Sequence, residues 1–225
     1  MKTKQYIPVV AIDGPSASGK GTVAQLVAEK LGYHYLDSGA LYRIVALAAK
    51  VENVSWQDGQ ALADLASKLC ISFGDGEIYL NEKNVSEQVR TEEMGKGASQ
   101  VAVHPALRQQ LVSLQHSFRK APGLVADGRD MATVIFPDAK TKIYLTATAE
   151  VRAERRYKQL MSKGIHANLA DILLDLQQRD ARDQQRTVAP LQQAKDAILL
   201  ETSDLSIEQA VRFVLDVSAS SKICS

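Results

Sequence analysis

The sequence predicts an α/β fold with a mainly parallel sheet. Apolar strand patterns alternate with amphipathic helical patterns along the 225 residues, as in proteins whose strands are joined by crossover helices. The clearest junction lies near the start, where the apolar run ending at Asp13 leads through a glycine-punctuated turn into the helical pattern TVAQLVAEKLG. A composition of 45% hydrophobic and 24% charged residues is typical of a globular domain.

The strand and helix patterns follow one another in a regular order. Apolar segments predict strands at about residues 7–13, 123–127, 142–147 and 197–202. Helical periodicity predicts helices at about 20–31, 38–50, 55–69, 91–102, 105–120, 149–164 and 168–186, and a last one from Ser206 onward. Three of these helices begin with residues typical of caps or capping boxes: Ser38, Ser55 with Asp58, and Ser206 with Gln209.

The segment CISFGDGEIYLNEKNVS interrupts this order. Its residues alternate between apolar and polar, and it contains the turn Asp75-Gly76, so it predicts a small antiparallel hairpin. A hairpin between helices of a parallel α/β protein indicates an insertion into the main fold, and not an appended module.

Composition excludes several classes of function. The net charge is only +1, which gives no sign of a nucleic-acid or membrane partner, and no apolar run approaches 18 residues. The start MKTKQYIPVV leads straight into a strand, so we expect no signal peptide. The two cysteines and four histidines lack the spacing of a disulfide or a metal site. We therefore expect a cytoplasmic monomer with no metal held directly by protein side chains.

The stretch GPSASGKGT between the first strand and helix predicts a phosphate-binding loop. Its glycines allow successive N–H groups to turn towards an anion, and the helix adds the positive end of its dipole. Lys20 supplies an ammonium group for the outer phosphates, whereas Gly21 stands where the usual pattern has a hydroxyl residue. We therefore expect Mg²⁺ to be held through waters and nucleotide phosphates. The predicted ATP-binding residues of the loop are Gly14, Pro15, Ser16, Ala17, Ser18, Gly19, Lys20, Gly21 and Thr22.

A phosphate loop fits a switch GTPase, a mechanical or regulatory ATPase, or a small-molecule kinase. A GTPase would need a guanine-reading Asn-Lys-x-Asp, which the sequence lacks, and a large ATPase would usually be longer. Numerous arginines near predicted strand ends favour a kinase, because two phosphate-bearing ligands need many fixed cations. An alternative remains for Arg152, Arg155 and Arg156, which a solvated helix face with neighbouring glutamates would also explain.

The motif ADGRDM follows a predicted buried strand. Asp127 ends the strand, where its carboxylate can orient the water shell of Mg²⁺ beside the phosphate loop. Arg129 and Asp130 come next, and an arginine with a carboxylate can read the amino donor and the acceptors of a cytosine edge. Uracil would leave some of these groups without partners.

Four motifs in this order resemble those of bacterial-type cytidylate kinases, in the nucleoside monophosphate kinase group: GPSASGKGT, LDSGALYR, LVADGRDMATVIFPDA and RDARDQQRTVAPL. With the hairpin they cover residues 8 to 216. The resemblance implies a P-loop kinase fold, that is, a five-stranded parallel sheet flanked by helices, a monophosphate-binding insertion with the hairpin, and a short helical lid. The implied core lies at about 7–37, 105–150 and 186–217, the insertion at 38–104 and the lid at 151–170.

The resemblance also implies an activity, the transfer of the γ-phosphoryl group of ATP to CMP or dCMP with Mg²⁺ required. It makes Lys20, Asp127, Arg129 and Arg179 the catalytic residues, and it places Arg155 or Arg156 of the lid against ATP. It assigns the CMP phosphate and ribose to Ser38, Tyr42, Arg43, Arg129, Arg179, Asp183 and Arg186, and the cytosine to Ser99, Arg108 and Asp130. Ser99 and Arg108 lie outside the four motifs.

Two alternatives to this activity remain open. One is a kinase of another specificity, for UMP, for both UMP and CMP, or for a small metabolite. The other is a nucleotide-binding regulator without catalysis.

Overall fold

The computed structural model describes residues 6–74 and 77–223, for residues 221–223 the backbone alone. The chain forms two compact units. The first comprises the residues up to Asp37 together with those from Ser117 onward, and the second is Ser38–His116. Each unit is described by itself.

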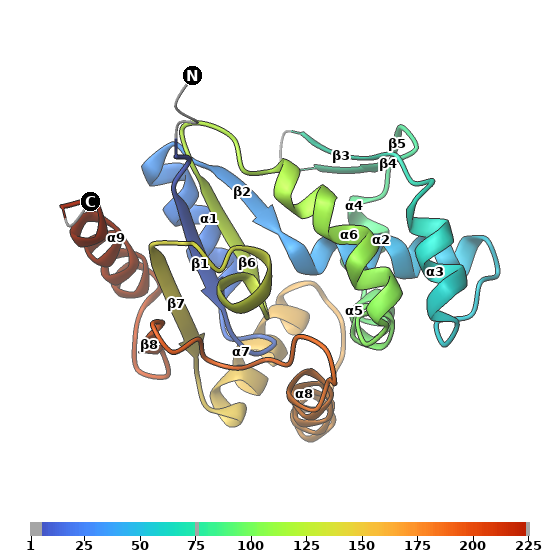
Figure 1. Cartoon of the computed structure of the whole chain (residues 1–225). Coiled ribbons are helices and arrows are strands. Elements are labelled where there is room, and N and C mark those ends of the chain that lie inside the picture. Colours follow the sequence, from blue (N-terminus) through green and yellow to red (C-terminus); the bar gives the residue numbers. More distant parts are fainter. Residues whose placement is uncertain (1–5, 75–76, 224–225) are drawn as a thin grey trace, which may run out of the picture. The chain divides into compact units, whose positions relative to one another are not determined.

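A five-stranded parallel sheet forms the centre of the first unit (Figure 1). Its strands are β1 (Val9–Asp13), β2 (His34–Asp37), β6 (Leu124–Gly128), β7 (Thr141–Thr146) and β8 (Ile198–Glu201), in the order β2-β6-β1-β7-β8. The predicted α/β class and five-stranded parallel sheet are confirmed. The residues of β2 did not predict a strand, because this four-residue edge strand buries only Leu36 fully.

The register of the strands places three carboxylates at one edge of this sheet. Asp37 at the end of β2 lies beside Asp127 of β6, and Ile12 lies on the other side of Asp127. Asp13 ends β1 one residue later. In open parallel sheets, ligands bind outside the carboxyl ends of the strands, and this edge is therefore where a site is expected.

Helices cover the sheet and extend beyond its carboxyl edge. The helices α1 (Lys20–Leu31) and α9 (Ile207–Ile223) pack on each other, and their buried side chains join those of the sheet in one apolar core. The helices α7 (Ala149–Ser162) and α8 (Leu169–Gln184) pack together beyond the strand ends (Figure 1). The π-helical turn η1 (Met131–Ile135) follows β6. The predicted capping box before α9 is confirmed, since the Gln209 N–H donates to Ser206 Oγ (3.2 Å) and the Ser206 N–H to Gln209 Oε1 (2.8 Å).

The second unit contains α2 (Ser38–Val51), α3 (Gly59–Ala66), α4 (Ser86–Val89), α5 (Glu92–Val101) and nearly all of α6 (Pro105–Ser117). The predicted hairpin is confirmed as β3 (Ile71–Gly74) and β4 (Glu77–Leu80), to which β5 (Lys83–Asn84) adds a third antiparallel strand. Its turn, Asp75-Gly76, lies outside the described residues.

Two helix starts in this unit differ from the prediction. The helix predicted from residue 55 starts at Gly59, because the Asp58 carboxylate caps it by accepting the Ala61 N–H at 2.9 Å. Ser55 Oγ instead accepts the N–H of Gln57, so the predicted box with Asp58 does not form. Ser38 stands inside the first turn of α2, directly after β2, and not before the helix as a cap. Among the described residues of both units, no helix combines the length and the apolar character needed to cross a membrane.

Candidate active site

The phosphate loop between β1 and α1 is tightly packed. A Cβ on Gly14 would lie 1.9 Å from the backbone oxygen of Leu145 in β7, and the φ of Gly19 is +88° just before α1 begins. A Cβ on Gly21 would lie 3.2 Å from Asp127 Oδ2. Glycine at these positions therefore brings the loop close to the ends of β6 and β7, and Gly21 leaves room for a carboxylate beside the first turn of α1.

Lys20 and Asp127 form a buried pair at the start of α1. Lys20 Nζ lies 3.5 Å from Asp127 Oδ1, and the Tyr35 hydroxyl donates to Asp127 Oδ2 at 3.4 Å. Burial raises the pKa of Asp127 to about 6, although the charge of Lys20 opposes the shift. Burial also lowers the pKa of Lys20, and the charge of Arg129 adds to this effect. The structure thus joins two residues that the sequence named separately, the loop lysine and the strand-end carboxylate.

Asp13 is a residue of this site that the sequence reasoning missed. Its carboxylate accepts the backbone N–H groups of Met131 and Ala132, both at 2.8 Å, and its side chain is buried. Burial raises the pKa of Asp13 to about 7, against the opposing effect of these two hydrogen bonds. Asp13 therefore fixes the start of η1, directly after Arg129 and Asp130. Its place at the end of a buried strand, like that of Asp127, was a signal that could have found it.

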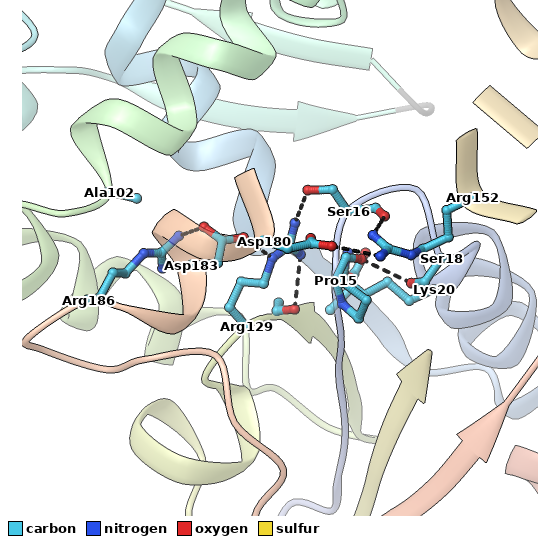
Figure 2. Close-up of polar contacts among 12 residues, drawn as sticks. Pro15, Ser16, Ser18, Lys20, Ala102, Arg129, Arg152, Asp180, Asp183 and Arg186 are labelled. Carbon is cyan, nitrogen blue, oxygen red and sulfur yellow. Dashed lines mark hydrogen bonds and ion pairs between the residues drawn. The ribbon is translucent and has the colours of Figure 1, made fainter. Parts of the chain in front are cut away.

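Arg129 connects the strand-end motif with α8 and the phosphate loop. Its Nε donates to Asp183 Oδ2 at 2.7 Å, and its Nη2 donates to Ser16 Oγ at 2.8 Å. Arg186 pairs with the other oxygen of Asp183, and Figure 2 shows Arg186, Asp183, Arg129 and Ser16 in one connected row. Burial would raise the pKa of Asp183, but Arg129 and Arg186 outweigh it, so the pKa lies below its ordinary value. Three residues assigned to the substrate thus form one ionised cluster.

Arg179 adds a further positive charge to this cluster. Its Nε is buried and has no hydrogen-bond partner among the described residues. Burial lowers the pKa of Arg179, and the charge of Arg129 contributes to the shift. A buried donor without a partner is costly, so this nitrogen is suited to an anionic ligand.

The arginines of α7 are more buried than a solvated helix face would be. Arg152 is 5% exposed, donates to Ser16 O at 3.0 Å and pairs with Asp180 at 2.7 Å. Arg155 donates to Ser18 O at 3.3 Å and also binds Thr202. The alternative of a solvated face is therefore wrong for these two.

Arg156 lies next to these residues but differs from them in its surroundings. It is half-buried, and its Nη1 contacts Gln159. Burial lowers its pKa, and the charge of Arg179 contributes to the shift. Arg156 and Arg179 are thus two like charges that act on each other.

Five of the predicted substrate residues lie in the second unit, namely Ser38, Tyr42, Arg43, Ser99 and Arg108. Arg108 is buried, donates to Ala102 O at 3.2 Å, and lies over the ring of Tyr42 with 5.6 Å from Cζ to the ring centroid. Arg43 donates to Val89 O at 3.0 Å and Thr91 O at 3.1 Å. The hydroxyl residues Ser38 and Ser99 are buried as well.

Metal ligands do not gather in the described parts of the chain. Among residues 6–74 and 77–223, no group of three or more histidine, cysteine, aspartate or glutamate side chains is arranged to hold a metal ion.

Comparison with known proteins places the whole chain in one family. The family model for cytidylate kinase matches residues 10–220. The chain is 64% identical over 209 residues to the cytidylate kinase of Polynucleobacter necessarius subsp. necessarius (strain STIR1), a match that covers 93% of this chain and 97% of that protein. It is 55% identical over 219 residues to the cytidylate kinase of Nitrosomonas europaea (strain ATCC 19718), covering 97% and 98%. The phosphate loop, the buried lysine and the arginine cluster thus occur in a chain that belongs to the cytidylate kinase family.

Proposed function

We propose that the chain transfers the γ-phosphoryl group of ATP to CMP or dCMP, which gives ADP with CDP or dCDP. One observation carries the proposal beyond the names of the relatives. Lys20, Arg129, Arg179 and Arg186 lie in one charge-coupled cluster that includes Asp127 and Asp183, and the buried Nε of Arg179 has no partner among the described residues. A buried guanidinium with an unused donor, grouped with three further cations, is suited to bind phosphate oxygens, as two nucleotides would provide.

Positioning and charge compensation account for the reaction. The N–H groups of the phosphate loop and the start of α1 bind the phosphates of ATP, and the Lys20 ammonium follows the transferred phosphoryl group. The guanidinium groups of Arg129 and Arg179 stabilise the charge that spreads over its oxygens in the transition state. A phosphate oxygen of CMP is the nucleophile and is already anionic, so no side chain has to activate it.

Magnesium fits this site as an ion carried by ATP. Asp127 Oδ1 is buried, accepts no hydrogen bond from the described residues, and lies beside Lys20. It is suited to accept a hydrogen bond from a water bound to Mg²⁺. When bound, the ion would neutralise part of the charge on the ATP phosphates. Asp127 would orient it through that water, and Gly21 leaves the space.

The CMP contacts follow the family resemblance. The cytosine would be bound by Ser99, Arg108 and Asp130, and the phosphate and ribose by Ser38, Tyr42, Arg43, Arg129, Arg179, Asp183 and Arg186. The stacking of Arg108 on Tyr42 supports this assignment, because it holds the guanidinium rigidly. Uracil does not present the same hydrogen-bonding groups as cytosine, so a rigid donor placed for cytosine would have no partner on UMP. The binding of UMP is therefore strongly disfavoured.

Arg156 is the lid arginine that we propose to contact ATP. Arg155 is already held by Ser18 and Thr202 within the first unit. Arg156 lies near enough to Arg179 for the charge of Arg179 to lower the pKa of Arg156. An ATP phosphate between these two guanidinium groups would relieve their repulsion.

A coupled assay with CMP, dCMP, UMP and AMP as acceptors tests the proposed function. We expect kcat/KM to be highest for CMP and dCMP. Comparable turnover of UMP or AMP would contradict the cytosine assignment. Failure to transfer phosphate from ATP to any of the four would support the non-catalytic alternative.

A further inference from the structure

Two arginines of α7 donate hydrogen bonds to alternate carbonyl groups of the phosphate loop. Arg152 Nη1 donates to Ser16 O at 3.0 Å, and Arg155 Nη1 donates to Ser18 O at 3.3 Å. Arg152 and Arg155 stand three positions apart, so they lie on one face of the helix. The proposed ATP-binding loop is thus held at Ser16 and Ser18 by the first turns of α7, which belongs to the segment that the family resemblance assigns to the lid.

Peptide geometry gives these contacts a consequence for anion binding. A trans peptide is planar, and its C=O and N–H groups point in opposite directions. A carbonyl of Ser16 that faces Arg152 therefore turns the N–H of Ala17 away from α7, and a carbonyl of Ser18 that faces Arg155 does the same for Gly19. We infer that Arg152 and Arg155 are positioning residues, which set the Ala17 and Gly19 N–H groups to donate to the phosphates of the nucleotide.

Each of the two arginines is itself held in place. Arg152 pairs with Asp180 Oδ2 at 2.7 Å, and its Nε donates to Ala147 O at 2.9 Å. Arg155 donates to Thr202 Oγ1 at 3.2 Å. Asp180 thus acts on the loop indirectly, because it holds the guanidinium group of Arg152, which orients the Ser16–Ala17 peptide.

Ser16 is held from a second direction as well. Its hydroxyl accepts a hydrogen bond from Arg129, which Asp183 orients, whereas its carbonyl accepts one from Arg152 (Figure 2). Asp180 and Asp183 also stand three positions apart on α8. One face of α8 therefore orients Arg129 and Arg152, which bind the hydroxyl and the carbonyl oxygen of Ser16. If the loop is to keep its shape, any closing motion of α7 has to pivot after Arg155.

The substitution Asp180→Asn tests this inference, which rests on the proposed binding of ATP by the loop. Asparagine keeps the size of the side chain but loses the charge that anchors Arg152. We expect the Kd for ADP with Mg²⁺, measured by calorimetry, to rise about tenfold, the equivalent of about 1.4 kcal/mol. The Kd for CMP should stay within about twofold, because Asp180 makes no hydrogen bond or ion pair with the described residues assigned to CMP and acts on Arg129 through its charge alone.

Asp196→Asn is the matched control. Asp196 pairs with Lys142 at the same 2.7 Å, and Lys142 is as shielded as Arg152, with 9% and 7% of the side chain exposed. Lys142 lies at the amino end of β7, away from the loop. This variant should bind ADP like the unchanged protein. Because Asp196 is more exposed than Asp180, at 65% against 14% of the side chain, urea unfolding of both variants accompanies the binding measurement, and a loss of ADP affinity in a folded Asp180→Asn protein reports on the loop.

A second variant and a spectroscopic signal keep the test decisive if Asp180→Asn folds poorly. Arg155→Lys removes the fork that joins Ser18 to Thr202, and it should also weaken ADP more than CMP. In NMR spectra of the unchanged protein, ADP should shift the amide protons of Ala17 and Gly19 downfield. Asp180→Asn should reduce the shift of the Ala17 amide, and Arg155→Lys should reduce that of the Gly19 amide. Unaltered ADP affinity in both variants, or equal losses for ADP and CMP, would overturn the inference. A protein that binds no ADP before substitution would instead refute the proposed function.

Discussion

Replacing Gly14 by alanine should damage the site through a backbone clash. The new Cβ would stand 1.9 Å from the backbone oxygen of Leu145, so the loop and β7 would have to separate by about 1 Å or more. Both belong to the main chain, and neither can turn aside as a side chain could. A displacement of about 1 Å in groups that bind the reacting phosphates lowers kcat/KM by about 100-fold, and the overpacking itself lowers the free energy of unfolding by about 1–3 kcal/mol.

Steady-state kinetics with ATP and CMP, together with urea unfolding, measure both effects. Gly32→Ala is the matched control, because Gly32 has a φ of +64° at the end of α1 but no atom within 4 Å of its added Cβ. The control should lose about 1 kcal/mol of stability from backbone strain and keep its kcat/KM. If Gly14→Ala retains kcat/KM within threefold of the unchanged protein, the close approach of loop and strand does not control the site, and the reasoning fails.

Three further predictions concern charged residues. Because burial raises the pKa of Asp13 to about 7 and of Asp127 to about 6, the folded protein retains protons between pH 4 and 7 that the unfolded chain has released. The free energy of unfolding should therefore fall as the pH rises through this window, by about 3 kcal/mol from Asp127 in all, of which about 1.4 kcal/mol falls between pH 5 and 7.5. Urea unfolding at these two pH values should show a fall that is smaller by about this amount for Asp127→Asn. Asp130→Ala should lower the ratio of kcat/KM for CMP to that for UMP by at least about tenfold, more than it slows transfer to CMP, and an unchanged ratio would contradict the assignment. Arg156→Ala should reduce kcat by about 100-fold with little effect on the Kd for ADP, since ADP lacks the phosphate that Arg156 is proposed to bind; equal losses in both would count against it.

The sequence was most informative where one local pattern determines the structure. The phosphate loop, the strands β1 and β6, and the hairpin all follow from short-range signals of apolar runs and turn residues. The strand β2 gave no such signal. Its residues His34–Asp37 pair with β6 on one side only, and the pairing partner lies about 90 residues further along the chain. Pairing over that distance is not encoded in the local pattern.

The arginines show the second limit of the sequence. Their number predicted an anionic ligand. It did not predict which arginines would be bound by other groups of the protein and which would be left for that ligand. Arg152 and Arg155 are bound to loop carbonyls, a contact that depends on how α7 packs beyond the sheet. Arg179 instead keeps a buried nitrogen without a partner among the described residues. Spacing along a helix fixes which side chains share a face, but the partner of that face comes from tertiary packing.

The hydrogen bonds of Arg129, compared with those of Arg179, indicate different roles for these two arginines. A guanidinium carries five N–H donors. Three of its hydrogen bonds go to protein groups, namely Asp183 Oδ2, Ser16 Oγ and the Gly128 carbonyl at 3.3 Å. Its remaining donors are therefore offered in one fixed direction, which reduces the entropy lost when a phosphate binds. Arg179 lacks such anchors among the described residues, so it can follow the phosphoryl group as charge shifts during transfer. A rigid Arg129 and an adaptable Arg179 would then serve the ground state and the transition state respectively, and substitution of Arg179 should affect kcat more than the affinity for CMP.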